Sequence, residues 1–198
     1  DRHVIEKLKL LRVPPAAIVD DGTFLRRSTV QIAGRLPTLM ETQAFLDDQS
    51  SNKREQLIER LLASEDYADQ FAQKWSDLLR NKRRGQKPRI PGTIAFHRWI
   101  RNAIAANMPY DQFVREQLAG DLLPNATLNQ LVASGYNRLN QTTEEGGSQA
   151  REYLAIYFAD RVRNVSQVFM GATLGCAQCH DHKYDPYTSR DFYSFGAF

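Results

Sequence analysis

The residues best suited to chemistry lie in one short run, where Cys176 and Cys179 are followed at once by His180. These are the only two cysteines among 198 residues. C-x-x-C-H is the attachment pattern of a c-type haem. Its two thiols can reach the two vinyl groups of one porphyrin edge, and the next residue offers an imidazole nitrogen to the iron. The spacing therefore predicts one covalent haem c, with His180 as the proximal iron ligand.

Two other interpretations of the same residues stay open. A C-x-x-C pair can be half of a zinc site, and His180 with His182 would complete a Cys₂His₂ set. Zinc usually takes its second pair from elsewhere in the chain, whereas here one short loop would have to surround the metal. The second alternative is a dithiol that undergoes redox chemistry. We favour haem attachment over both.

The second axial ligand would decide between electron transfer and catalysis. His182 is a poor candidate, because two residues span at most about 7 Å of chain and the ligand must lie across the iron from His180. We expect His182 instead to bond a propionate or carbonyl, or to bind another metal. His97 ranks first as a distal ligand and Met108 below it, and an open or water-bound iron is the alternative. Weaker candidates are Met170, Met40 and His3. No catalytic residue is assigned.

Length and composition predict one globular domain over residues 1–198, since 42% of the residues are hydrophobic and such a chain can bury a sizeable core. No apolar run approaches the roughly 18 residues that a membrane span needs, and no basic-then-apolar leader begins the chain. Haem c is attached outside the cytoplasmic membrane in bacteria, so we expect an export signal upstream and a periplasmic or extracellular location. The net charge of +3 gives no indication of a nucleic-acid partner.

Charged residues form three local clusters. The basic cluster, within residues 80–91, is interpreted as a solvated connector or as a docking patch for an acidic redox partner. Two acidic clusters, Glu144 with Glu145 and Asp181 with Asp185, fit capping and salt bridges, or alternatively calcium binding or hydrogen bonding to His180. The basic residues are Arg80, Lys82, Arg83, Arg84, Lys87 and Arg89.

Helical periodicity dominates the chain, and strand-like alternation is scarce. Thr38 with Glu41 forms a capping box, and Ser64 is a second N-cap. The last long helix delivers the chain to the haem motif. We therefore predict an all-α fold, an irregular multi-helix domain with the haem near its C-terminal end. The expected helices are 38–48, 52–64, 64–79, 94–107, 110–119, 127–135, 148–170 and a final one from Thr188.

Several separated stretches follow one order: 60–64 (RLLAS), 108–124 (MPYDQFVREQLAGDLLP), 144–147 (EEGG), 160–162 (DRV), 175–186 (GCAQCHDHKYDP) and 191–193 (DFY). Together they resemble the planctomycete cytochrome-type domain, a haem-motif family of unknown function in large secreted bacterial proteins. The resemblance covers nearly the whole chain. It departs after Trp75, where this chain has the run 81–85 (NKRRG). The resemblance implies an exported haem protein with no settled activity, which commonly continues into a second domain.

Electron transfer through one haem is the function we favour. The alternatives are a haem enzyme with an open distal site, a redox module of a polysaccharide-processing system, and a structural domain stapled by haem. The pattern of residues 190–198 predicts a helix whose apolar face is too large to remain exposed to solvent. This face consists of Phe192, Tyr193, Phe195 and Phe198. We therefore expect a neighbouring domain or subunit of a larger polypeptide or assembly to cover it. The other partner that we expect is a redox protein.

Overall fold

The computed structural model describes residues 1–81, 90–140, 147 and 149–197, and these form helices and turns with no strand among them. The expected all-α fold is therefore confirmed. The chain divides into two compact units, residues 1–70 and 71–198, which are taken separately below. The single domain expected over residues 1–198 stays a prediction. None of the helices described is long and apolar enough to cross a membrane.

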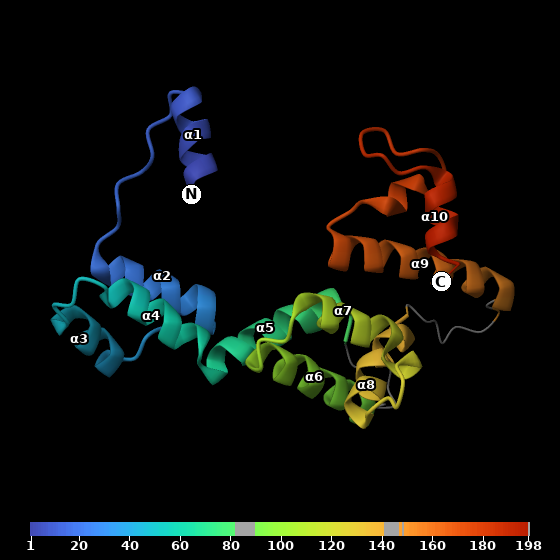
Figure 1. Cartoon of the computed structure of the whole chain (residues 1–198), viewed down its shortest axis with the longest axis horizontal. Helices are drawn as coiled ribbons and strands as arrows, with labels where there is room; N and C mark the ends of the chain where they lie inside the picture. Colours follow the sequence, from blue (N-terminus) through green and yellow to red (C-terminus); the bar gives the residue numbers. More distant parts are fainter. Residues whose placement is uncertain (82–89, 141–146, 148, 198) are drawn as a thin grey trace. The chain divides into compact units, whose positions relative to one another are not determined.

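The first unit is a small helical cluster built from α2 (Asp21–Ala33), α3 (Leu39–Asp47) and α4 (Lys53–Leu62), with α2 packed on both of the others (Figure 1). Its core consists of Leu25, Ala33, Phe45, Leu57 and Leu61. The expected capping box is present, because the Thr38 hydroxyl accepts from the backbone of Glu41 and the Glu41 carboxylate accepts from the backbone of Thr38.

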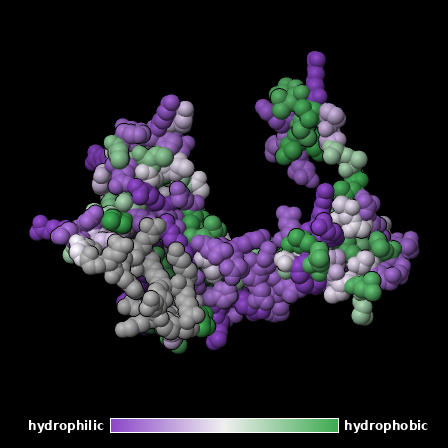
Figure 2. Space-filling view, turned by 180° about the vertical axis from the view of Figure 1, so that it is seen from behind, coloured by the Kyte–Doolittle hydropathy of each residue, from purple (hydrophilic) through white to green (hydrophobic). Residues whose placement is uncertain are grey.

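A preceding helix, α1 (Arg2–Leu10), buries none of its residues. It exposes Val4, Ile5 and Leu10, and Figure 2 shows hydrophobic side chains on its surface. Neither α1 nor α2 was expected from the sequence. The signal for α2 was local, since the side chain of its N-cap Asp20 accepts from the backbone of Thr23, which is the cap that starts helices.

A first core of the second unit surrounds Trp99. It forms where α6 (Ile90–Ala105), α7 (Tyr110–Ala119) and α8 (Leu128–Ala133) meet the end of α5 (Glu65–Leu78). Short 3₁₀ helices, η1 (Gly120–Leu122) and η2 (Ser134–Arg138), flank α8. The bounds of α7 agree with those expected. In contrast, α6 begins four residues before the expected Ile94, because Pro91 lies in its first turn, where a missing N–H costs nothing.

The long helix α9 (Ala150–Met170) is attached to this core by side chains. Tyr136, fully buried, donates to Asn164 Oδ1 at 2.6 Å, and Asn164 Nδ2 donates to the carbonyl of Leu78 at 3.2 Å. Arg80 forms an ion pair with the buried carboxylate of Asp160. Arg80 is the one member of the basic cluster among the described residues; the others lie outside them, as do Glu144 and Glu145.

A separate core joins α9 to the 3₁₀ helix η3 (Leu174–Gln178) and to α10 (Ser189–Phe195) (Figure 1). It contains Ala159, Val162, Leu174, Ala177 and Phe192. The expectation that α10 exposes its apolar face is wrong for Phe192, which is 0% exposed and lies edge-on to Phe158 of α9. Phe195 also packs inside this unit. The chain itself thus covers much of the face assigned to a neighbour, while Tyr193 stays half exposed and Phe198 lies outside the described residues.

Candidate functional site

The haem-motif cysteines lie on a 3₁₀ helix whose exposure repeats every three residues. Leu174 and Ala177 are buried, whereas Cys176 and Cys179 are exposed. In a 3₁₀ helix the side chains of residues i and i+3 eclipse one another, and Cys179 caps η3 with a helical backbone conformation. Both thiols therefore lie on one solvent-facing side of the turn. Neither is in a disulfide bond, so the structure shows a free dithiol.

The path from α9 into η3 is fixed by backbone geometry. Gly171 ends α9 in the left-handed conformation, with φ of 62°, and the amide of Ala172 returns to the carbonyl of Ser166 at 2.9 Å. A methyl group added at Gly175 would lie 2.7 Å from Cγ of Arg163. Glycine at this position therefore lets η3 approach α9 closely. Arg163 also donates to the side-chain oxygen of Gln178, between the two cysteines.

His180 follows the turn with its ring exposed. Its Nδ1 lies 2.8 Å from the carbonyl oxygen of Asp181. A carbonyl can only accept, so Nδ1 carries a proton, and in the neutral ring Nε2 then keeps its lone pair. A histidine held in this tautomer by a carbonyl is a typical metal ligand. The exposed thiols and this imidazole therefore fit the donor set that a c-type haem requires.

His182 is held quite differently. Its Nδ1 accepts from the backbone amides of Tyr184 and Asp185, at 3.2 and 2.8 Å. Because amides only donate, the ring proton is on Nε2, which bonds the Thr173 hydroxyl at 3.0 Å. Both nitrogens are thus engaged within the protein. The partners are a hydroxyl and two amides, and not the propionate, carbonyl or second metal that we expected. The exclusion of His182 as the second ligand of the same iron stays a prediction.

The carboxylates after the motif accept hydrogen bonds from the protein. Asp181 accepts from the amide of Ser189 at 2.8 Å, and Asp185 from the hydroxyl of Thr173 at 3.2 Å. Bonds from the backbone and side chain of Thr188 hold the pKa of Asp191 below its usual value, which completes the cap of α10. Within the described ranges, no three His, Cys, Asp or Glu residues gather as a metal site. The Cys₂His₂ zinc set is therefore not assembled among these residues. Calcium binding at Asp181 and Asp185 stays a prediction.

A hollow of about 250 Å³ borders the motif on the side of α9. Glu152, Ile156 and Arg163 line it from the helix, and Gln178 lines it from the turn. Its lining combines apolar side chains with groups of both charges. Neither Gln178 nor Arg163 could be identified from the sequence. The intervening positions of C-x-x-C-H carry no required chemistry, and Arg163 lies outside the motif, on α9.

The candidate distal ligands lie in other surroundings. The Nδ1 of His97 on α6 is 2.9 Å from the hydroxyl of Ser76 on α5. Met108 packs against the core around Trp99. Met170 is half exposed at the end of α9, and Met40 and His3 belong to the first unit. The contacts given for His97 and Met108 are with residues outside the core of η3. A distal role for either stays a prediction.

The chain was also compared with known proteins. No curated protein matches it, and no solved structure matches it. One family does match, over residues 1–198, and it is described as PSCyt2, a protein of unknown function (DUF1549). This agrees with the expected family at the level of a family without an assigned activity. Because the match covers the whole sequence, the chain belongs to the PSCyt2 family.

Proposed function

We propose that this chain carries one haem c, bound through thioethers at Cys176 and Cys179, and that it transfers electrons. The observation that supports the proposal best is the arrangement of the motif. Two free thiols share the exposed side of one turn, and the next residue offers an imidazole with Nε2 free. A purely structural role of the two cysteines would explain neither the exposure of their thiols nor the adjacent histidine.

Each residue has a defined part in the proposal. Cys176 and Cys179 would hold the haem as thioethers, each formed by addition of an S–H across one vinyl double bond without loss of electrons. His180 donates the Nε2 lone pair to iron while Asp181 holds the ring through Nδ1. A bound haem supplies a one-electron iron couple. Leu174 and Ala177 anchor the turn from its buried side, and the two thiols therefore face solvent, where a redox partner could approach.

Haem attachment would also determine where the protein is located. Covalent haem attachment takes place outside the bacterial cytoplasm, so we expect the protein to be exported to the periplasm or beyond. The partner is a redox protein, or an adjoining domain or subunit.

Substitution of the proximal ligand tests the coordination. In His180→Ala, the absorption spectrum of the haem protein should change strongly, because the iron loses its fixed nitrogen donor. His3→Ala is the matched control, since His3 is 94% exposed and lies in the other unit. An unchanged spectrum in His180→Ala would place the ligand elsewhere.

A redox titration of the wild-type protein tests electron transfer. It should show reversible one-electron reduction, with the fold retained in both states. A haem that cannot be reduced and reoxidised reversibly would favour the structural role over electron transfer.

A further inference from the structure

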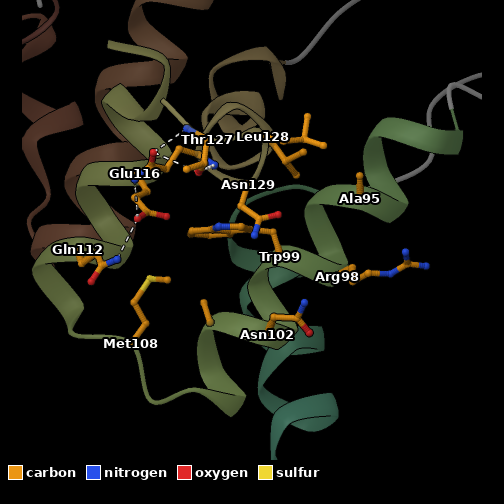
Figure 3. Close-up of a pocket in the computed structure, with 13 residues that line it drawn as sticks. Ala95, Arg98, Trp99, Asn102, Met108, Gln112, Glu116, Thr127, Leu128 and Asn129 are labelled. Carbon is orange, nitrogen blue, oxygen red and sulfur yellow. Dashed lines mark hydrogen bonds between the residues drawn. The ribbon is translucent and has the colours of Figure 1, made fainter. Parts of the chain in front are cut away.

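The second unit contains a pocket away from the cysteine motif, between α6, α7 and α8 (Figure 3). Its volume is about 480 Å³, which is within the range of small-molecule sites. Trp99 and Met108 contribute apolar surface, and Gln112, Glu116 and Asn129 contribute polar groups. The haem proposal uses none of these residues except Met108, a weak ligand candidate.

Glu116 is the unusual member of this lining, because it is 5% exposed. Two hydrogen bonds reach its Oε1, one from Gln112 Nε2 at 2.9 Å and one from Gln130 Nε2 at 3.3 Å. Gln130 is itself fixed, since its oxygen accepts from the backbone of Thr127 at 2.9 Å. Figure 3 shows the carboxylate of Glu116 directed toward the space beside Trp99. The acid is therefore held in one orientation.

Among the residues that the structure describes, Glu116 forms no ion pair, and both hydrogen bonds to its carboxylate come from neutral amides. A glutamine oxygen at position 116 could accept the same two hydrogen bonds. A charge removed from water is costly unless a charged partner accompanies it. Arg98 also lines the pocket, but Figure 3 shows its side chain extending away from Glu116. A cation inside the pocket would supply the missing partner.

The remaining walls suit the apolar part of such a ligand. Trp99 is 6% exposed and stacks on Phe113, with ring centroids 5.2 Å apart and planes 17° apart. These rings fix the wall, and the flexible thioether of Met108 can adjust to an alkyl chain. The amides of Asn102 and Asn129 add neutral polar groups at the edge of the pocket.

We infer that this pocket binds a small organic cation, an ammonium group on an apolar stem, with Glu116 as its counter-ion. The ammonium donates to the carboxylate oxygen that the two glutamines do not occupy, and the stem lies against Trp99 and Met108. The inference is independent of haem attachment, because it involves neither cysteine nor His180.

The test compares two probes of similar size on the wild-type chain, n-butylammonium chloride and 1-butanol. Binding is followed through the side-chain amide NMR signals of Gln112 and Gln130. Butylammonium should shift these signals with saturation, and 1-butanol should bind at least about tenfold more weakly, because it lacks the charge-assisted hydrogen bond. No saturable shift with butylammonium, or equal binding of both probes, would overturn the inference.

Two matched variants locate the effect. Glu116→Gln keeps the shape and both amide hydrogen bonds, and it should weaken butylammonium binding about tenfold or more. Asp111→Asn removes the same charge from an exposed position on α7, and it should leave binding unchanged. Equal loss in both variants would mean non-specific attraction to the helix and would refute the site. If Glu116→Gln does not fold, the comparison of the two probes on the wild type still decides.

Discussion

Phe192→Ala should be the most damaging single change near the cysteine motif. Phe192 is fully buried and packs with Leu174 and Ala177, the two buried residues of η3. Its ring also meets Phe158 edge-on, with centroids 5.9 Å apart and planes 72° apart. Removal deletes this apolar burial and leaves a cavity between α9, η3 and α10. The free energy of unfolding should therefore fall by about 3–5 kcal/mol, a large share of a typical domain's stability.

Tyr184→Ala is the matched control, because it also deletes an aromatic ring but Tyr184 is 83% exposed. Its cost should stay within about 0.5 kcal/mol. Urea denaturation followed by circular dichroism measures both variants. Hydrogen exchange at the Cys176 amide, which bonds the carbonyl of Thr173 at 3.1 Å, reports whether the turn itself opens. Equal stability of the two variants, with unchanged protection at Cys176, would refute the idea that Phe192 holds the motif in place.

Three further changes test other parts of the structure. Bonds from Arg35 hold the pKa of Glu41 at about 2, below its ordinary 4.5, so this pair should stabilise the fold above pH 4.5 and lose that effect as the pH falls to 2. Glu41→Gln should remove that acid sensitivity from thermal melting, a difference of roughly 1 kcal/mol because the pair is partly screened by solvent; identical acid profiles would contradict this. Gln117→Met should raise the free energy of unfolding in urea by about 1 kcal/mol, since Oε1 of this fully buried side chain has no partner among the described residues. A clear loss of stability would refute this. His182→Ala should speed tryptic cleavage after Lys183, because two backbone amides lose their acceptor, and an unchanged cleavage rate would show that the loop does not depend on this ring.

Local signals explain the part of the fold that the sequence predicted. Thr38 and Glu41 are three residues apart, and their capping box depends on nothing else in the chain. Thr188 and Asp191 form another such box at α10. The burial of Phe192 is different, because its partner Phe158 lies 34 positions earlier in the chain. Helical periodicity does not show which distant residue packs against a helix face. An apolar helix face shows only that something covers it, and here the cover is largely α9.

In the candidate site, too, the local pattern could be predicted from the sequence, whereas the features that depend on the fold could not. The spacing of Cys176, Cys179 and His180 was visible at once, because the attachment chemistry requires these residue types in this order. The sequence could not show that both thiols share an exposed side, which follows from η3 being a 3₁₀ turn. It also could not show that Thr173 and two amides occupy both nitrogens of His182. The pocket around Glu116 joins three helices, and no short motif marks it.

Intact mass after denaturation tests the central claim most directly. The chain is exported from bacterial cells that attach haem c, beside a known c-type cytochrome as a positive control and a Cys176→Ser/Cys179→Ser variant as a negative one. The wild-type chain should keep the added mass of one haem under denaturing conditions, and the double variant should show the mass of the chain alone. A wild-type chain without haem, exported from cells in which the control cytochrome is fully loaded, would contradict haem attachment at this motif.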